Sequence, residues 1–237
     1  MGFGIIRQLV VVTDGHANQG CSPVDAARMI AARGITVSAV GILDGGHLGE
    51  RGRDEVEAIA AAGGGSANCV ETADLSRTLW SVTWQATQCT LNAMINRELH
   101  KIAGITWTEL PPEKRKGIIE LTAGLADQTE LQLILLLDTS ASMAGKMAAL
   151  SSSVKDLMVA LQEREGETYI SAAGYPGREQ VIKTLFPKSD RLFSWEELRP
   201  EGRTPTGPAL LQACKLMFRS PELLRNTDEH TRLDVII

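Results

Sequence analysis

The 237-residue sequence has few aromatic residues, no excess of basic residues and no apolar run of membrane-spanning length. Aromatic residues make up only 4% of the chain, and the formal net charge of −5 gives no electrostatic reason to expect nucleic acid or an anionic membrane as a partner. A membrane helix needs roughly 20 consecutive apolar residues, which no segment provides. If the chain has a site that depends on charge, we expect that site to hold a cation.

The sequence also contains no CxxC pair, and its first residues predict no signal peptide. Cys21, Cys69, Cys89 and Cys214 are widely spaced and form no CxxC pair, so we expect reduced thiols that are buried as small hydrophobic side chains. The first residues lack the basic and apolar regions of a secretory signal. Together these features predict a cytoplasmic protein.

What the sequence does contain is an alternation of apolar runs and helical patterns. Near-continuous apolar runs predict strands that are buried on both faces, most clearly over 5–13, 35–42 and 131–137. Helices are predicted over 23–34, 54–62, 74–103 with a break near 89–92, 113–126, 147–161 and 207–218. The segments 168–173 and 180–186 flank a turn and predict an antiparallel hairpin. This alternation indicates an α/β fold with a mainly parallel sheet and helices on both faces.

A cluster of oxygen-bearing side chains follows one of these strands. Asp138, Ser140 and Ser142 come directly after the strand 131–137, at the end where open α/β sheets bind ligands. Hard oxygen donors of this kind suit Mg²⁺ or Mn²⁺. Taken alone, the pattern is equally consistent with hydroxyl groups that cap the following helix.

Two further segments carry oxygen donors at comparable positions. Thr204 and Thr206 lie in a loop that opens a helix, and Asp14 ends the strand 5–13 within a TDG sequence. With these segments the chain resembles the von Willebrand factor A-type (vWA) family, whose metal-ion-dependent adhesion site combines a DxSxS motif, a threonine loop and an aspartate that often lies in TDG. The resemblance implies that one Mg²⁺ or Mn²⁺ is held by Asp138, Ser140, Ser142, Thr204 and Asp14. Thr206 is the alternative to Thr204, because the family's ligand is usually the first threonine of such a pair.

The order of the motifs departs from the family. A standard vWA chain runs from DxSxS through the threonine loop to the TDG strand, whereas here the TDG half comes first. We therefore interpret residues 1–237 as one circularly permuted, Rossmann-like vWA domain, mostly parallel with one antiparallel edge strand. Its predicted parts are the family's C-terminal half (1–103), a connector (104–129), the family's N-terminal half (130–218) and a tail (219–237). The reversed order resembles that of small intracellular vWA-like proteins from endospore-forming bacteria.

The resemblance implies a protein-binding module and not an enzyme. Three hydroxyl groups and two carboxylates leave the cation electrophilic, so an open coordination position can take an Asp or Glu carboxylate from a partner protein. One alternative is a structural vWA module with a vacant metal site. Another is a phosphotransferase or phosphatase of the haloacid dehalogenase type, which needs a second carboxylate where Ser140 stands.

Two segments compete for the place beside the strand 131–137. The tail residues 233–237 begin like a strand, and residues 5–13 claim the same position. We expect residues 5–13 to occupy it, because that segment is longer, more uniformly apolar and supplies Asp14. The chain is then predicted to be a monomer, and the alternative is a dimer in which one chain's N-terminal half completes the other's sheet.

Overall fold

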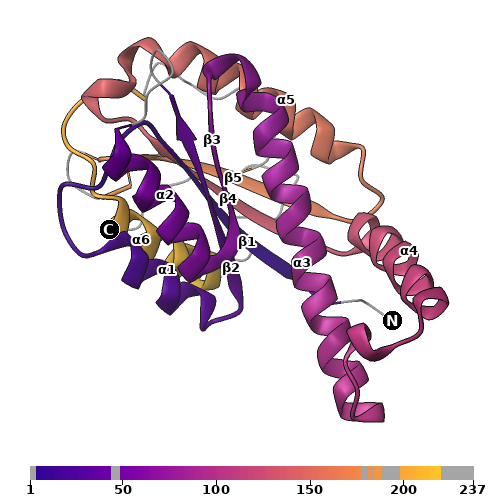
Figure 1. Ribbon diagram of the computed structural model, residues 1–237. Coiled ribbons are helices and arrows are strands. Elements are labelled where there is room, and N and C mark those ends of the chain that lie inside the picture. The colour runs from indigo at the N-terminus through magenta and orange to yellow at the C-terminus, as the bar shows by residue number, and fades with distance from the viewer. Residues whose placement is uncertain (1–3, 44–48, 178–180, 183, 188–197, 220–237) are drawn as a thin grey trace.

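In a computed structural model of the protein, both halves of the chain contribute strands to one six-stranded sheet (Figure 1). The structure describes residues 4–43, 49–177, 181–182, 184–187 and 198–219, so the predicted strand at 233–237 lies outside the described residues. The strand order is β3-β2-β1-β4-β5-β6. The strands are β1 (Ile6–Thr13), β2 (Ile35–Ile42), β3 (Gly64–Val70), β4 (Leu131–Asp138), β5 (Thr168–Tyr175) and β6 (Thr184–Pro187).

The centre of the sheet joins the two halves of the chain. Strands β1 and β4 run parallel, with a register that pairs Ile6 with Leu131 and Val12 with Leu137. Every residue of β4 is buried, as expected for an apolar run covered on both faces. The N-terminal segment therefore occupies the position beside β4, as the sequence predicted.

Strands β1 to β5 all run in the same direction. At one edge of the sheet β6 pairs with β5 in the antiparallel direction, so the predicted hairpin is present, with Ala172 opposite Phe186. The predicted α/β, Rossmann-like fold class is confirmed.

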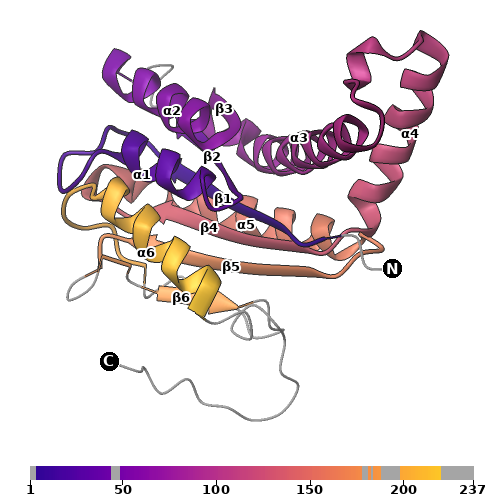
Figure 2. The same ribbon diagram turned by 90° about the horizontal axis from the view of Figure 1, so that it is seen from below.

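Helices cover both faces of the sheet (Figures 1 and 2). The α-helices are α1 (Pro23–Ala31), α2 (Glu50–Gly63), α3 (Leu75–Ala103), α4 (Pro112–Gln128), α5 (Met147–Gln162) and α6 (Thr206–Arg219), with 3-10 turns at Thr72–Asp74, Trp107–Glu109 and Ala141–Gly145. One buried cluster joins α1, α2 and α6 to one face, and a second joins α3, α5 and the end of α4 to the other. None of the described helices is long and apolar enough to cross a membrane.

Three expectations from the sequence were wrong. Helix α3 runs without the break predicted near 89–92, because Leu91 within that stretch is buried in the core and tertiary packing stabilises the helix there. Helix α4 is more than a connector, since its last turns bury Leu125 and Ala126 in the core. All four cysteines are free, but only Cys214 is buried, while Cys21 and Cys89 are exposed.

Candidate metal centre

The carboxyl ends of β1 and β4 lie side by side and bring two distant aspartates to one edge of the sheet. Asp138 is the last residue of β4, and Asp14 directly follows β1. The hydroxyl of Thr13 donates a hydrogen bond of 2.6 Å to Oδ2 of Asp138 across 125 positions of sequence. The predicted adjacency of these two strand ends is therefore confirmed.

Four of the five predicted ligand residues form one hydrogen-bonded chain. Ser142 Oγ donates to Asp14 Oδ1 at 2.7 Å, and the hydroxyl oxygens of Ser140 and Ser142 lie 3.1 Å apart. Asp138 Oδ1 accepts the backbone N–H of Ser140 at 2.8 Å, and the Ser140 hydroxyl also bonds this carboxylate. Asp138 and Ser140 are buried, whereas Ser142 is exposed. The cluster therefore opens to solvent on the Ser142 side.

The surroundings of Asp138 disfavour the ionised form of its carboxyl group. Its side chain is fully buried, and this burial raises the pKa of the carboxyl above the ordinary value of 3.8, with a further increase from the charge of Asp14. Hydrogen bonds from Thr13 and Ser140 act in the opposite direction but do not cancel the effect of burial. A nearby cation would favour the ionised form of this carboxyl.

The threonine loop packs against the loop that follows β1. The backbone N–H of Thr204 donates to Asn18 Oδ1 at 3.0 Å, and the N–H of Asn18 donates to the Thr204 carbonyl at 3.2 Å. Thr206 begins α6, and its hydroxyl lies 3.5 Å from the buried Tyr175 hydroxyl. These contacts place Thr204 beside the Asp14 loop, while its role as a ligand stays a prediction.

The same loop is fixed to the DxSxS segment on its other side. Glu201 N–H donates to the Thr139 carbonyl at 2.9 Å, and Ala141 N–H donates to the Gly202 carbonyl at 3.4 Å. Three loops from separate parts of the sequence thus meet at the carboxyl edge of the sheet.

A lysine that the sequence analysis missed lies in the middle of this cluster. Lys146 Nζ lies 2.8 Å from Asp14 Oδ2 and 3.4 Å from the Ser142 carbonyl. The side chains of the Lys146–Asp14 ion pair are only 9% and 1% exposed. The sequence did indicate an unusual role for this residue. A lysine directly before a helix is disfavoured by the helix dipole, so its presence indicates a contact outside the helix.

The donor set fits a hard divalent cation. In the part of the chain that the structure describes, no group of three or more His, Cys, Asp and Glu side chains could hold a metal ion. The cluster instead offers two carboxylates and the hydroxyls of Ser140 and Ser142, which are the oxygen ligands that Mg²⁺ and Mn²⁺ accept. His16, two residues after Asp14, is exposed.

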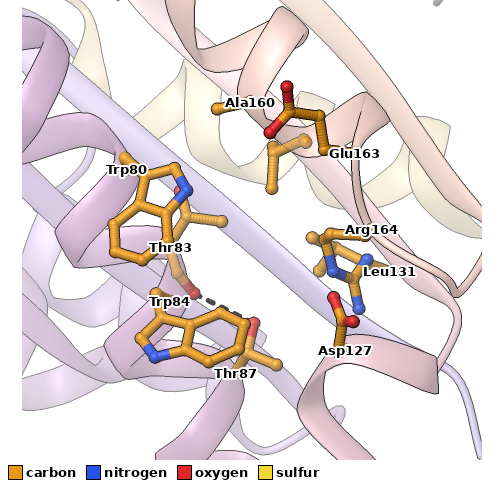
Figure 3. Close-up of a pocket in the computed structure, with 10 residues that line it drawn as sticks. Trp80, Thr83, Trp84, Thr87, Asp127, Leu131, Ala160, Glu163 and Arg164 are labelled. Atoms are coloured by element: carbon orange, nitrogen blue, oxygen red, sulfur yellow. Dashed lines mark hydrogen bonds between the residues drawn. The ribbon is translucent and has the colours of Figure 1, made fainter.

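A cavity of about 230 Å³ lies at the opposite, amino end of β4 (Figure 3). Helices α3 and α5 and the end of α4 line it, together with Leu131 of β4. The rings of Trp80 and Trp84 stack on one side, with centroids 5.6 Å apart, and Glu163 and Arg164 lie on the other. None of the predicted metal ligands lines this cavity.

Comparisons with known proteins identify close relatives but no assigned activity. No family model matches the chain. The chain is 36% identical to the "Uncharacterized protein YabS" of Bacillus subtilis (strain 168) over 242 aligned positions, which cover 99% of this chain and 98% of that protein. A crystal structure of an uncharacterized protein from Alicyclobacillus acidocaldarius is similar at a TM-score of 0.84 and 36% identity, covering 92% of this chain and 96% of that one. Both relatives therefore match the chain along nearly its whole length.

Proposed function

The chain belongs to the same family as the uncharacterized protein YabS of Bacillus subtilis, and we propose that it is a vWA-like module that binds a protein partner through a divalent cation. The hydrogen bond between Ser142 and Asp14 carries this proposal. It joins residues 128 positions apart, so the two halves of the chain meet at two of the proposed ligands, which supports the proposal.

In the proposed site Asp14, Asp138, Ser140, Ser142 and Thr204 hold Mg²⁺ or Mn²⁺. The cation supplies a Lewis-acidic centre that can bind an Asp or Glu carboxylate of the partner protein. The chain itself holds the oxygen donors in place through the paired ends of β1 and β4. The exposure of Ser142 gives the partner access from solvent.

The residue at position 140 supports a binding role over phosphotransfer. Phosphotransferases of the haloacid dehalogenase type need a second carboxylate two residues after the nucleophile. The position that would hold the second carboxylate of such an enzyme is occupied by Ser140.

Calorimetric titration with Mn²⁺ and Mg²⁺ tests the metal half of the proposal. We expect the wild-type chain to bind one cation and Ser142→Ala to weaken that binding about tenfold or more, because the hydroxyl is both a ligand and a contact of Asp14. Ser152→Ala is the matched control, since Ser152 is an exposed serine on α5 outside the cluster. Equal affinity in wild type and Ser142→Ala, or no binding by wild type, would contradict the proposal.

The partner half is tested with pools of immobilised acidic peptides, each paired with its Asn/Gln counterpart. Retention of the wild-type chain by the acidic peptides in Mg²⁺, with loss in EDTA and on the amide counterparts, is the expected result. Binding that persists in EDTA would refute a metal-bridged contact.

A further inference from the structure

Lys146 stands where local helix energetics disfavour it. It connects the 3-10 turn Ala141–Gly145 to α5 and takes the N-cap position of that helix, with φ −108° and ψ −12°. N-cap positions favour Ser, Thr, Asp and Asn, and the positive end of the helix dipole repels an ammonium group. Its side chain makes no capping hydrogen bond to α5. The choice of lysine is therefore not explained by the helix it precedes.

The side chain of Lys146 instead engages a proposed metal ligand. Both carboxylate oxygens of Asp14 are used, Oδ1 by the Ser142 hydroxyl at 2.7 Å and Oδ2 by Lys146 Nζ at 2.8 Å. Because the Lys146–Asp14 pair is nearly inaccessible to solvent, water screens its charges weakly. Any cation that binds Asp14 is thus strongly coupled to the Lys146 ammonium.

We propose that Lys146 is a tethered counter-cation that competes with the divalent metal for Asp14. It thereby sets the concentration of free Mg²⁺ or Mn²⁺ at which the site fills. This inference rests on the proposed cation-binding function and adds to it a residue that tunes occupancy.

The charges at the site explain why Lys146 should weaken binding of the metal. The carboxylates of Asp14 and Asp138 are offset by one ammonium, so a single net negative charge of this trio attracts the metal. Neutralising Lys146 doubles that charge and removes a direct repulsion within a buried cluster. The metal should then bind more tightly, while the wild-type site leaves more of the cation's positive charge available to an anionic ligand.

The test is a titration of the full chain with Mg²⁺ alone and with Mn²⁺ alone. Lys146→Met keeps most of the side chain's length and removes its charge, and we expect it to lower the Kd about tenfold or more. Lys146→Arg keeps the charge and should stay within about threefold of wild type. Lys155→Met is the matched control, because Lys155 is an exposed lysine on α5.

Thermal melting distinguishes competition between Lys146 and the metal from a role of Lys146 in stability alone. It also shows whether Lys146→Met folds. Removing one partner of a buried ion pair leaves the other uncompensated, so Lys146→Met should melt below wild type in EDTA. Saturating Mg²⁺ should then raise its melting temperature more than that of wild type. An equal decrease in both conditions would show that Lys146 only stabilises the fold.

The possible outcomes distinguish this inference from the function on which it rests. Binding by wild type with equal or weaker binding by folded Lys146→Met overturns the inference and leaves the function standing. Binding by Lys146→Met alone supports the inference and overturns metal binding by the natural chain. If neither binds, both fall. If Lys146→Met does not fold, Lys146→Gln replaces it under the same criteria.

Discussion

The two ends of strand β4 carry different kinds of chemistry, and they are built in different ways. At its carboxyl end short oxygen-bearing side chains meet on three loops, and Ser142 bonds a residue 128 positions away. At its amino end Leu131 lines a cavity that is walled mainly by helices, with stacked tryptophans on one side (Figure 3). The strand has eight residues, which separates the two ends by about 25 Å.

This difference predicts whether a substitution at each end changes mainly cation binding or mainly stability. The loops at the carboxyl end hold the proposed site but contribute little to the buried clusters, whereas the amino end lies among core helices. Changes at the carboxyl end should therefore affect cation binding more than stability, and changes at the amino end should do the reverse. Because the ends are far apart, their effects should also be additive.

The largest expected effect is the loss of cation binding in Asp138→Asn. The variant keeps the shape of the side chain but removes one of two carboxylates from the site, so Mg²⁺ affinity should decrease about a hundredfold. Calorimetry on the purified chain measures this, with Asp156→Asn on the exposed surface of α5 as the control. Retained affinity in Asp138→Asn would remove this residue from the proposed site.

The same variant should change how stability in EDTA depends on pH. Burial raises the pKa of Asp138 in the folded protein, so the stability it contributes is present below its ordinary value of 3.8 and is lost as the pH rises through the higher folded value. Asp138→Asn should therefore flatten the decrease in unfolding free energy from just above pH 3.8 to neutral. Urea unfolding at a series of pH values measures the slope, and an unchanged slope would assign it to another group.

The next largest effect is expected at the amino end, from Arg164→Met. The guanidinium of Arg164 donates to the Ala126 carbonyl at 2.6 Å and to the Thr129 carbonyl at 2.8 Å, where α4 leads into β4. Loss of both bonds should cost about 2–3 kcal/mol of unfolding free energy. Chemical denaturation measures this, with the exposed Arg51→Met as the control. A changed Mg²⁺ affinity in Arg164→Met would show that the two ends of β4 do not act independently.

A smaller effect is expected from Gly207→Ala, which tests how closely the loops must approach. A Cβ on Gly207 would lie 2.2 Å from the Cys21 carbonyl oxygen, so the start of α6 would have to move away from the loop after β1. We expect a loss of about 1–2 kcal/mol and weaker cation binding. Gly145→Ala is the control, because a Cβ there meets no atom within 4 Å. Equal Mg²⁺ affinity in both variants would show that loop spacing does not matter.

The position of the site was predictable because it follows from the sheet. Two apolar runs of nearly equal length each end in an aspartate, and parallel neighbours present their ends at one edge. The apolar runs and the residues after them predicted two aspartates at strand ends, and the vWA resemblance implied that the two strands are neighbours.

The contacts around the site were not predictable in the same way. Lys146 and Asn18 act through side chains that reach across loops, and no periodicity in the sequence records that direction. The continuity of α3 was missed for a related reason. Leu91 lies within the predicted break and is buried in the core, and this tertiary packing outweighs the low helix propensity of Thr90 and Asn92.

The pairing of β1 with β4 also has a consequence for synthesis on the ribosome. Ile6 pairs with Leu131, so β1 leaves the exit tunnel long before its central neighbour has been translated. During that interval β1 can pair with β2, but the backbone N–H and C=O groups along the other edge of this apolar strand have no partner strand. Unpaired apolar edges are prone to aggregation. We therefore expect the nascent chain to depend on chaperones until β4 emerges. This dependence would follow from the order in which the strands of the sheet are translated.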